Sequence, residues 1–315
     1  MRSLIGLLLL SLVVTACSDN STTSSEEPQL SSSSAPETTS VLPSGYNTER
    51  NAYFGDLHVH TMYSFDAFIF GTTSSPDDAY EFAKGGTLTH PAGFDMSLDT
   101  PLDFYGVSDH AFYLGVLRQM ADPSTEISKH PAAAGMSTLG GSDDRGSKFR
   151  AILAFMGSGR GEEINDPSIR KEAWDDIVAS ANRHNDPGNF TAFVAYEYTA
   201  SDADRGNLHR NVIFRDDIAP ELPFSRLDSS NPEDLWAWMD NNRANGIESL
   251  AIPHNSNGSN GSMFMLTDNA GRPIDDAYAN LRMRNEPLVE ITQVKGTSDT
   301  HPALSPNDES VSYTH

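Results

Sequence analysis

From residue 51 onward, short apolar runs alternate with longer segments in which apolar residues recur every three or four positions. Runs of four to eight residues rich in aromatic and β-branched side chains predict strands. Six such runs are present, at residues 53–60, 103–110, 191–198, 209–214, 249–255 and 288–294. Each run carries, at or near one end, a residue able to bind a metal ion.

The segments between the runs include two clear helix patterns. Residues 165–184 predict a helix because Asp166 can cap the first turn and apolar residues follow at helical spacing. Residues 231–246 predict another, with Asn231 as the cap and Gly246 as the terminating residue. Shorter helices are expected at 76–84 and 275–284.

Strands that alternate with helices predict a parallel sheet, and metal-binding residues at strand ends predict a barrel-like sheet whose carboxyl edge holds the site. The expected fold class is therefore α/β, with a TIM-barrel-like arrangement. The long segment 121–160 contains GMSTLGGSDDRGSK and is expected to be an insertion beside that edge rather than part of the core.

The N-terminal 17 residues predict a signal peptide, because an apolar stretch too short to span a bilayer follows a basic start. The sequence VTAC before and at Cys17 resembles a bacterial lipobox, which predicts lipidation of Cys17; an ordinary secretory signal with a chance cysteine is the alternative. Residues 18–50 are rich in Ser, Thr, Pro and Glu and predict a disordered tether. The folded domain is expected at 51–315.

Charge and cysteine content exclude some classes of function. Lys and Arg number 21 against 44 Asp and Glu, and the formal net charge is −23, so the surface disfavours nucleic acid as a partner. The single cysteine excludes disulfides within the chain and thiolate metal sites.

The candidate metal site begins with His58 and His60. These residues are two positions apart at the end of a predicted strand, so both side chains leave the same face and can bind one ion. Asp66, six residues after His60, is a further candidate, and others lie at the ends of other predicted strands: His110, Glu197, His209 and His254. Imidazole and carboxylate are ligands of zinc, manganese and ferrous iron. The set predicts a site for two or three divalent ions.

The order of these residues resembles the PHP (polymerase and histidinol phosphatase) superfamily, whose members are metal-dependent phosphoesterases on a distorted seven-stranded (βα) barrel. The segments YFGDLHVHTMYSFDAFIFG, PLDFYGVSDHAFYLG, NLHRNVIF and AIPHNSNGSNG are similar in particular to the PHP-like domain of unknown function 3604 family. This resemblance extends from about Tyr53 to the C-terminus.

The resemblance implies roles for the first two ions. His58 and His60 match the pair that binds the first ion, and Glu197 matches the carboxylate that bridges to the second. His209 and His254 would complete the second site.

The resemblance also implies a third ion and a late Asp-x-His motif. Asp66, which stands where many members have histidine, would hold the third ion with His110. The late motif matches Asp299 and His301, but they follow the last predicted strand without the usual intervening helix, so the true motif is alternatively expected beyond residue 315. Six strands instead of seven also predict an incomplete barrel, and a fragment or truncated reading frame is favoured over a complete enzyme.

The predicted activity is metal-dependent hydrolysis by a metal-bound hydroxide, with a small anionic or phosphoester substrate. Asp109 is a candidate proton acceptor or a partner that orients an imidazole, with a strand-end cap as the structural alternative. Arg210 is a candidate for neutralising an anionic substrate.

Other functions remain open at this point. The same chemistry could hydrolyse an amide or another ester, and a non-catalytic metal-binding or solute-binding lipoprotein, or an inactive fragment, is the alternative from a different class. The N-terminus predicts a location in the cell envelope of a Gram-negative bacterium, attached to the membrane by lipid, and Ser18 after Cys17 is compatible with the outer membrane.

Overall fold

The computed structural model describes residues 51–202, 205–293 and 296–297. Three residues with predicted roles, Cys17, Asp299 and His301, lie outside this part of the chain, as do the predicted signal peptide and tether.

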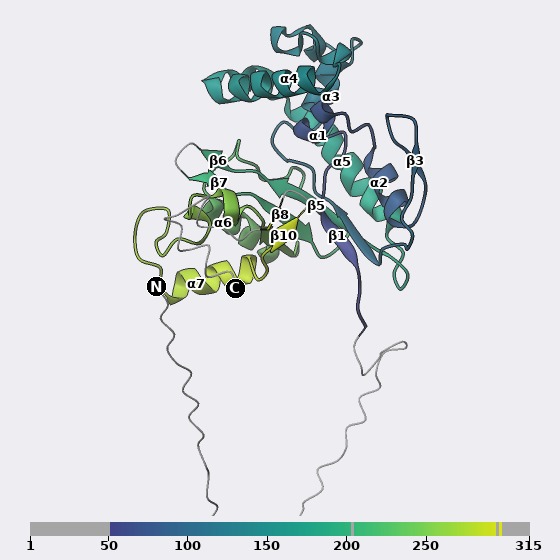
Figure 1. Ribbon diagram of the computed structural model, residues 1–315. Helices are drawn as coiled ribbons and strands as arrows, with labels where there is room; N and C mark the ends of the chain where they lie inside the picture. The colour runs from purple at the N-terminus through teal and green to yellow at the C-terminus, as the bar shows by residue number, and fades with distance from the viewer. Residues whose placement is uncertain (1–50, 203–204, 294–295, 298–315) are drawn as a thin grey trace, which may run out of the picture. The chain divides into compact units, whose positions relative to one another are not determined.

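The described residues form a mixed α/β fold around a curled, five-stranded half-barrel sheet (Figure 1). The strand order is β1 (Gly55–Val59), β4 (Phe104–Val107), β5 (Thr191–Tyr198), β8 (Arg210–Phe214) and β9 (Ser249–Pro253). The sheet curls enough for β1 and β8 to approach each other although two strands separate them in this order. Glycine is needed at Gly55, because an added Cβ would lie 2.2 Å from the carbonyl oxygen of Phe104 on the neighbouring strand.

The prediction of a wholly parallel sheet is wrong. β1, β4 and β5 are parallel, but β8 runs antiparallel to both β5 and β9. The start of β8 therefore lies at the same edge of the sheet as the carboxyl ends of β5 and β9. This edge, which we call the site edge, collects chain segments from all five strands.

The sixth predicted strand, 288–294, does not join the sheet within the described residues. Only Thr292–Gln293 (β10) is extended, and it pairs with Gly296–Thr297 (β11) in a short hairpin. Just upstream, the backbone N–H of Glu290 donates to the carbonyl of Pro253 at the end of β9. The apolar side chains of Leu288 and Ile291 are more than half exposed, so this run lacks the burial that the strand prediction assumed.

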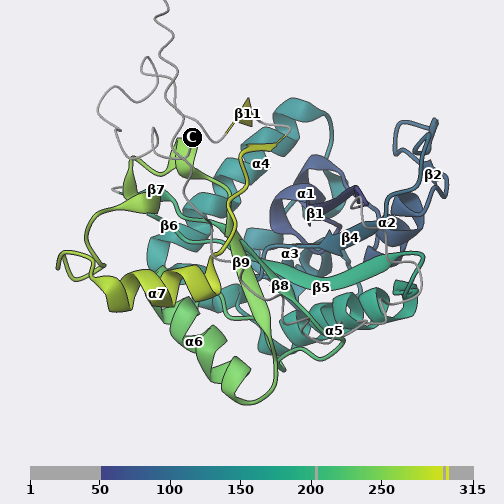
Figure 2. The same ribbon diagram turned by 90° about the horizontal axis from the view of Figure 1, so that it is seen from below.

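The two long predicted helices are confirmed. α5 (Pro167–His184) begins where the Asp166 carboxylate accepts hydrogen bonds from two backbone N–H groups, and α6 (Pro232–Ala244) begins at a cap formed by Asn231. α2 (Pro76–Ala83) and α7 (Asp276–Asn285) match the shorter predictions. α5, α6 and α7 lie along β5, β8 and β9 (Figure 2), and their apolar residues share one core with the sheet.

The segment 121–160 stays outside the sheet, as expected for an insertion. It contains α4 (Ser142–Phe155), which packs with α1 (Phe65–Phe70) and α3 (Val116–Ala121) around a second apolar cluster. The guanidinium of Arg145 donates to the carbonyl of Ile69 and so joins α4 to the end of α1.

The remaining elements are short. The strands among them are β2 (Leu88–Thr89), β3 (Asp95–Met96), β6 (Ser201–Asp202) and β7 (Gly206–Asn207). The others are the 3₁₀ turns Ile127–Lys129, Pro131–Ala133, Met136–Thr138, Gly161–Ile164, Ser256–Gly258 and Ser262–Phe264, and a π turn at Met156–Arg160.

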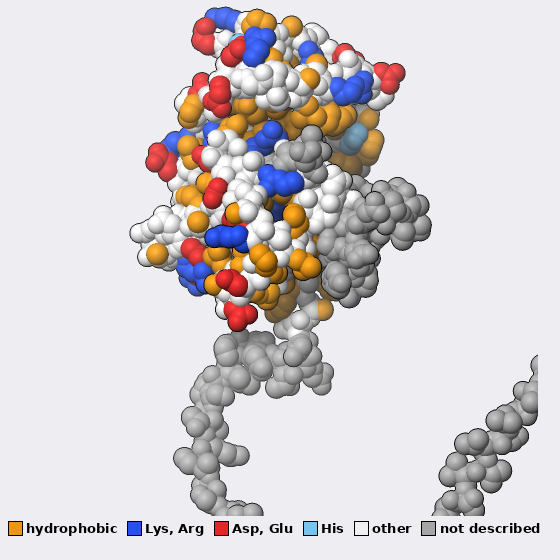
Figure 3. All heavy atoms as spheres, turned by 90° about the vertical axis from the view of Figure 1, so that its left-hand side faces the viewer, with side chains coloured by type: hydrophobic (Ala, Val, Ile, Leu, Met, Phe, Trp, Pro, Cys, Tyr) orange, Lys and Arg blue, Asp and Glu red, His pale blue; other side chains and the backbone are white. Residues whose placement is uncertain are grey.

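The surface of the described residues mixes charges of both signs. On the face in Figure 3, Lys and Arg side chains are interspersed with Asp and Glu side chains, and apolar side chains lie between them. No helix in the described part of the chain is both long and apolar enough to cross a bilayer.

Candidate metal centre

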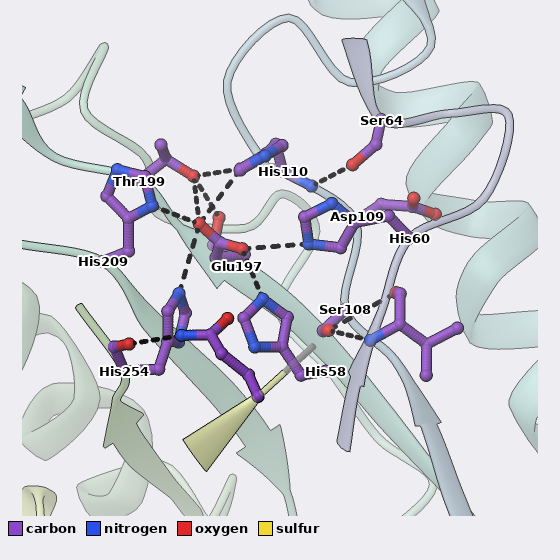
Figure 4. A network of polar contacts seen from close by, with 12 residues as sticks. His58, His60, Ser64, Ser108, Asp109, His110, Glu197, Thr199, His209 and His254 are labelled. Atoms are coloured by element: carbon purple, nitrogen blue, oxygen red, sulfur yellow. Dashed lines mark hydrogen bonds and ion pairs between the residues drawn. The ribbon is translucent and has the colours of Figure 1, made fainter. Parts of the chain in front are cut away.

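Five histidines and one glutamate converge at the site edge (Figure 4). His58 and Glu197 lie near the ends of β1 and β5, and the other imidazoles lie one to three residues beyond the bounds of β1, β4, β8 and β9. The set is His58, His60, His110, Glu197, His209 and His254. Segments separated by as much as 196 positions therefore share one site, because the strands that carry them are neighbours in the sheet.

The Glu197 carboxylate lies at the centre of this set and is almost completely buried. Its Oε2 atom lies 2.9 Å from Nε2 of His60 and 3.4 Å from Nε2 of His58. Ligand atoms around one divalent ion with bonds near 2.1 Å are separated by about 3 to 3.4 Å. One carboxylate oxygen and the His-x-His pair are therefore spaced as ligands of a common ion.

The second oxygen of Glu197 faces a different group of imidazoles. Its Oε1 atom lies 2.8 Å from Nδ1 of His209, 3.1 Å from Nδ1 of His110 and 3.6 Å from Nε2 of His254. Because the two oxygens serve separate groups, the carboxylate has the placement expected of a bridge between two ions.

Asp66 lies in the first turn of α1 and completes a third group. One of its oxygens lies 3.2 Å from Nε2 of His110, and the other lies 3.5 Å from Nδ1 of His60. The second apolar cluster holds α1 in place beside the site edge, since Phe65 is buried and its ring packs against the rings of His110 and Phe149. The insertion therefore supports the helix that carries this carboxylate.

Sequence reasoning missed Glu290. Its Oε2 atom lies 3.0 Å from Nδ1 of His58, on the side of the ring opposite to the nitrogen that faces Glu197. The run 288–294 was predicted only as a strand, and its carboxylate was given no role. The strand-end rule that identified the other ligands does not apply to Glu290, because its segment is not a strand of the sheet.

Within the described residues, four groups of three side chains have ligand atoms that all lie within 4.8 Å of one another. They are His58, His60 and Glu197; His58, His254 and Glu290; His60, Asp66 and His110; and Glu197, His209 and His254. Shared members connect the four groups, so the arrangement could hold more than one ion.

Electrostatics keep the carboxylates ionised. Burial alone would raise the pKa of Glu197, but the surrounding imidazoles hold it well below its usual value. Burial alone would lower the histidine pKa values, but the carboxylates raise those of His58 and His60 to about 9 and that of His110 to about 10. The imidazole nitrogens and carboxylate oxygens that form these ion pairs are thus the same atoms that could bind cations.

His254 differs from the other imidazoles. Burial lowers its pKa to about 3, so the ring is neutral and carries a lone pair. Neither ring nitrogen has a hydrogen-bond partner among the described residues, and both are buried. A neutral imidazole with an unsatisfied nitrogen beside a carboxylate fits a metal ligand. The donor set as a whole fits zinc, manganese or ferrous iron.

Asp109 lies beside the site but does not join any of the four groups. Its two oxygens accept hydrogen bonds from the backbone N–H of Thr61 at 2.5 Å and from the Thr61 hydroxyl at 2.6 Å. Burial raises the pKa of this carboxyl. Its contacts correspond to the structural alternative considered for it, because they fix the turn that follows β1.

The structure does not bring Arg210 to the metal-binding groups. Successive side chains of a strand point to opposite faces, and Arg210 lies on the helix-covered face of β8. There its guanidinium forms a buried ion pair with Glu286 and donates to the carbonyl of Leu208. Trp236 of α6 donates to the same Glu286 carboxylate. Arg210 is therefore placed to hold α6 and α7 against the sheet.

Comparison with protein families matches residues 47–315 to a family described as "Protein of unknown function (DUF3604)". No curated protein and no solved structure matches the chain.

Proposed function

The chain belongs to the DUF3604 family, whose function is unknown, and from this premise we propose that it is a metal-dependent hydrolase with phosphoesters as its preferred substrates. The observation that carries the proposal is the position of Glu197, whose two oxygens face different groups of imidazoles. A bridging carboxylate of this kind is suited to a centre of two or three ions that are close enough to act on one substrate.

Divalent ions bound there would activate water and neutralise negative charge on a phosphoryl or acyl group. The chain's own residues would hold the centre in place. Asp109 fixes the turn at Thr61, between His60 and α1, and Glu290 orients His58 through a hydrogen bond to its Nδ1 atom. Hydrolysis of an amide or another ester would use the same arrangement.

We further propose that the half-barrel belongs to a (βα) barrel of the PHP type. The order of the ligands along the chain and their meeting at one sheet edge support this assignment, as does the parallel arrangement of β1, β4 and β5. Lipidation at Cys17 and location in the cell envelope of a Gram-negative bacterium also remain part of the proposal; they rest on the N-terminal sequence alone.

A non-catalytic metal-binding protein is the second candidate. The observation that favours it is that both side chains predicted to assist catalysis are engaged elsewhere: Asp109 with Thr61 and Arg210 with Glu286. Binding without turnover would need only the imidazoles and carboxylates of the site edge.

The two candidates are separated by metal analysis and an assay of the same preparation. The purified chain is loaded with zinc, manganese or ferrous iron, its metal content is measured, and hydrolysis of 4-nitrophenyl phosphate esters is followed with and without a chelator. The hydrolase proposal predicts at least two ions per chain and turnover that the chelator abolishes. Two bound ions with no turnover under any of the three metals would establish the second candidate instead.

Glu197→Gln is the variant that tests the bridging role of this carboxylate. It removes the charge that both groups of imidazoles share, so we expect loss of at least one ion and of activity. Glu221→Gln, at an exposed position away from the site, is the matched control and should leave both unchanged. Full metal content in Glu197→Gln would contradict the bridging role.

A further inference from the structure

A cavity of about 800 Å³ opens beside the metal-binding groups, on the concave face of the half-barrel. His58, His60 and Asp66 form its metal-binding side, and Glu290 and Gln293 enter it from the segment after α7. A volume of this size accommodates a small-molecule substrate next to the reacting centre.

Apart from the imidazoles of His58 and His60, which belong to the metal-binding groups, the charged side chains that line the cavity are all acidic. Its acidic lining residues are Asp56, Asp66 and Glu290, and no Lys or Arg lies among the described residues that line it. Apart from bound ions and these two imidazoles, no described side chain in this lining would neutralise a second phosphate or carboxylate on a substrate. An additional anionic group would instead meet carboxylates at short range.

The wall farther from the metal-binding groups is apolar. Leu57, Phe104 and Ile252 line it from three strands of the sheet, and Leu288 lines it from the segment after α7. Leu57 and Ile252 belong to the apolar cluster of the concave face. Such a wall favours contact with an uncharged, largely apolar group.

One buried amide, that of Asn211, interrupts this wall beside the centre. Asn211 is the direct cross-strand partner of Glu197, so the two side chains lie on the same face of the sheet. The residue is almost completely buried, lines the cavity, and has no hydrogen-bond partner for Oδ1 among the described residues. Buried polar atoms are normally satisfied, so this oxygen is available to a donor on a ligand or on water.

We propose that this cavity binds the body of the substrate, and that the substrate is an ester with a single anionic reacting group and an otherwise uncharged, partly apolar body. Its reacting group lies at the metal centre, its apolar part lies against Leu57, Phe104 and Ile252, and Asn211 forms a hydrogen bond beside the reacting group. An aryl or alkyl phosphodiester fits this description, whereas nucleoside polyphosphates do not. The inference rests on the proposed function for the identity of the reacting group.

The first test measures binding, independently of turnover. Methyl phenylphosphonate, with one charge and an apolar ring, and methylenediphosphonate, with several charges and no apolar group, are titrated calorimetrically into the metal-loaded full chain. We expect the phenyl compound to bind at least about 10-fold more tightly. Equal or tighter binding of the diphosphonate would overturn the substrate class.

The second test addresses Asn211. Asn211→Leu keeps the side-chain size and removes the amide, and we expect it to weaken binding of methyl phenylphosphonate by about 5-fold to 20-fold. Asn182→Leu, at an exposed position of α5, is the matched control and should have no effect. Metal content and thermal unfolding are measured for both variants. A stable, fully metallated Asn211→Leu protein with unchanged affinity would remove Asn211 from the site.

Hydrolysis of bis(4-nitrophenyl) phosphate and of ATP by the same preparation distinguishes failure of this inference from failure of the proposed function. Turnover that prefers ATP would refute the substrate class and leave the hydrolase intact. Selective binding of the phenyl compound with no turnover of either phosphate compound would refute the hydrolase and leave the binding cavity.

Discussion

Nδ1 of His209 lies 2.8 Å from Oε1 of Glu197, although the two residues belong to segments that run in opposite directions. Glu197 is near the end of β5, and His209 immediately precedes β8. If β8 were parallel to β5, its start would lie at the opposite edge of the sheet, roughly 15 Å away for a strand of this length. The antiparallel direction of β8 is therefore required for His209 to reach the site edge.

Metal binding should release protons. The pKa values of about 9 for His58 and His60 and about 10 for His110 mean that these imidazoles are protonated in the metal-free protein at pH 7.5. Each must lose a proton to offer its lone pair to an ion, so we expect release of about three protons per chain on full loading. Titration calorimetry in buffers of different ionisation enthalpy measures this number. The apparent affinity should also rise with pH between 6 and 9, and an affinity independent of pH in this range would contradict the expectation.

Asp66 should be a ligand of one ion, and its substitution should not affect binding of the others. Its oxygens contact His110 and His60 but lie in a different group from His209 and His254. Asp66→Asn weakens the group by removing a charge, so we expect the metal content to fall by about one ion per chain. Asp66→His should retain that ion, because imidazole is an equivalent ligand. Metal analysis of the two variants after dialysis checks both outcomes, and equal metal content in the two would show that Asp66 binds no ion.

Glu290→Gln should lower the affinity for metal, because we expect Glu290 to orient the ligand His58 and not to be a ligand itself. The Glu290 carboxylate accepts a hydrogen bond from Nδ1 of His58, which leaves Nε2 of the ring directed at Glu197. Loss of such an orienting carboxylate typically lowers metal affinity by about 10-fold to 100-fold. Competition with a chromogenic chelator measures the change. A complete loss of one ion would mean that Glu290 is itself a ligand, whereas unchanged affinity would mean that it contributes to neither role.

Local sequence patterns predicted the parts of the fold that depend on local interactions. The Asp166 and Asn231 caps located α5 and α6, and the apolar runs located the five strands of the sheet. Strand direction could not be predicted in the same way, because an apolar run has the same composition in a parallel and an antiparallel pair. This is why the reversal of β8 was missed while the run itself was found.

The candidate site was predictable where its residues fall at strand ends. His58, His60 and His254 come together because their strands end at one edge, and Glu197 meets them from the strand between. Glu290 could not be found by that rule, since its segment is not a strand of the sheet. Arg210 was assigned to the site because it adjoins His209 in sequence. Side-chain alternation along β8 places these neighbours on opposite faces, and that alternation outweighs sequence proximity.

Arg210 should therefore affect stability rather than metal binding. Its guanidinium and the Glu286 carboxylate are both buried, and Glu286 also accepts from Trp236. Burial alone would raise the pKa of Glu286, but Arg210 and Arg282 lower it, so the carboxylate is charged. Arg210→Met would leave this buried charge without its main partner, and we expect the free energy of unfolding to fall by about 3–5 kcal/mol.

Urea denaturation of three variants tests this role of Arg210. The double variant Arg210→Met/Glu286→Leu removes both buried charges and should recover most of the stability lost in the single variant, because an apolar pair can replace a buried ion pair. Arg284→Met breaks a more exposed pair with Asp240 and should change the free energy of unfolding by less than about 1 kcal/mol. Metal content should be unchanged in all variants that remain folded. If Arg210→Met kept full stability but lost binding of a phosphonate, Arg210 would belong to the substrate site and its assignment to the helix-covered face would be wrong.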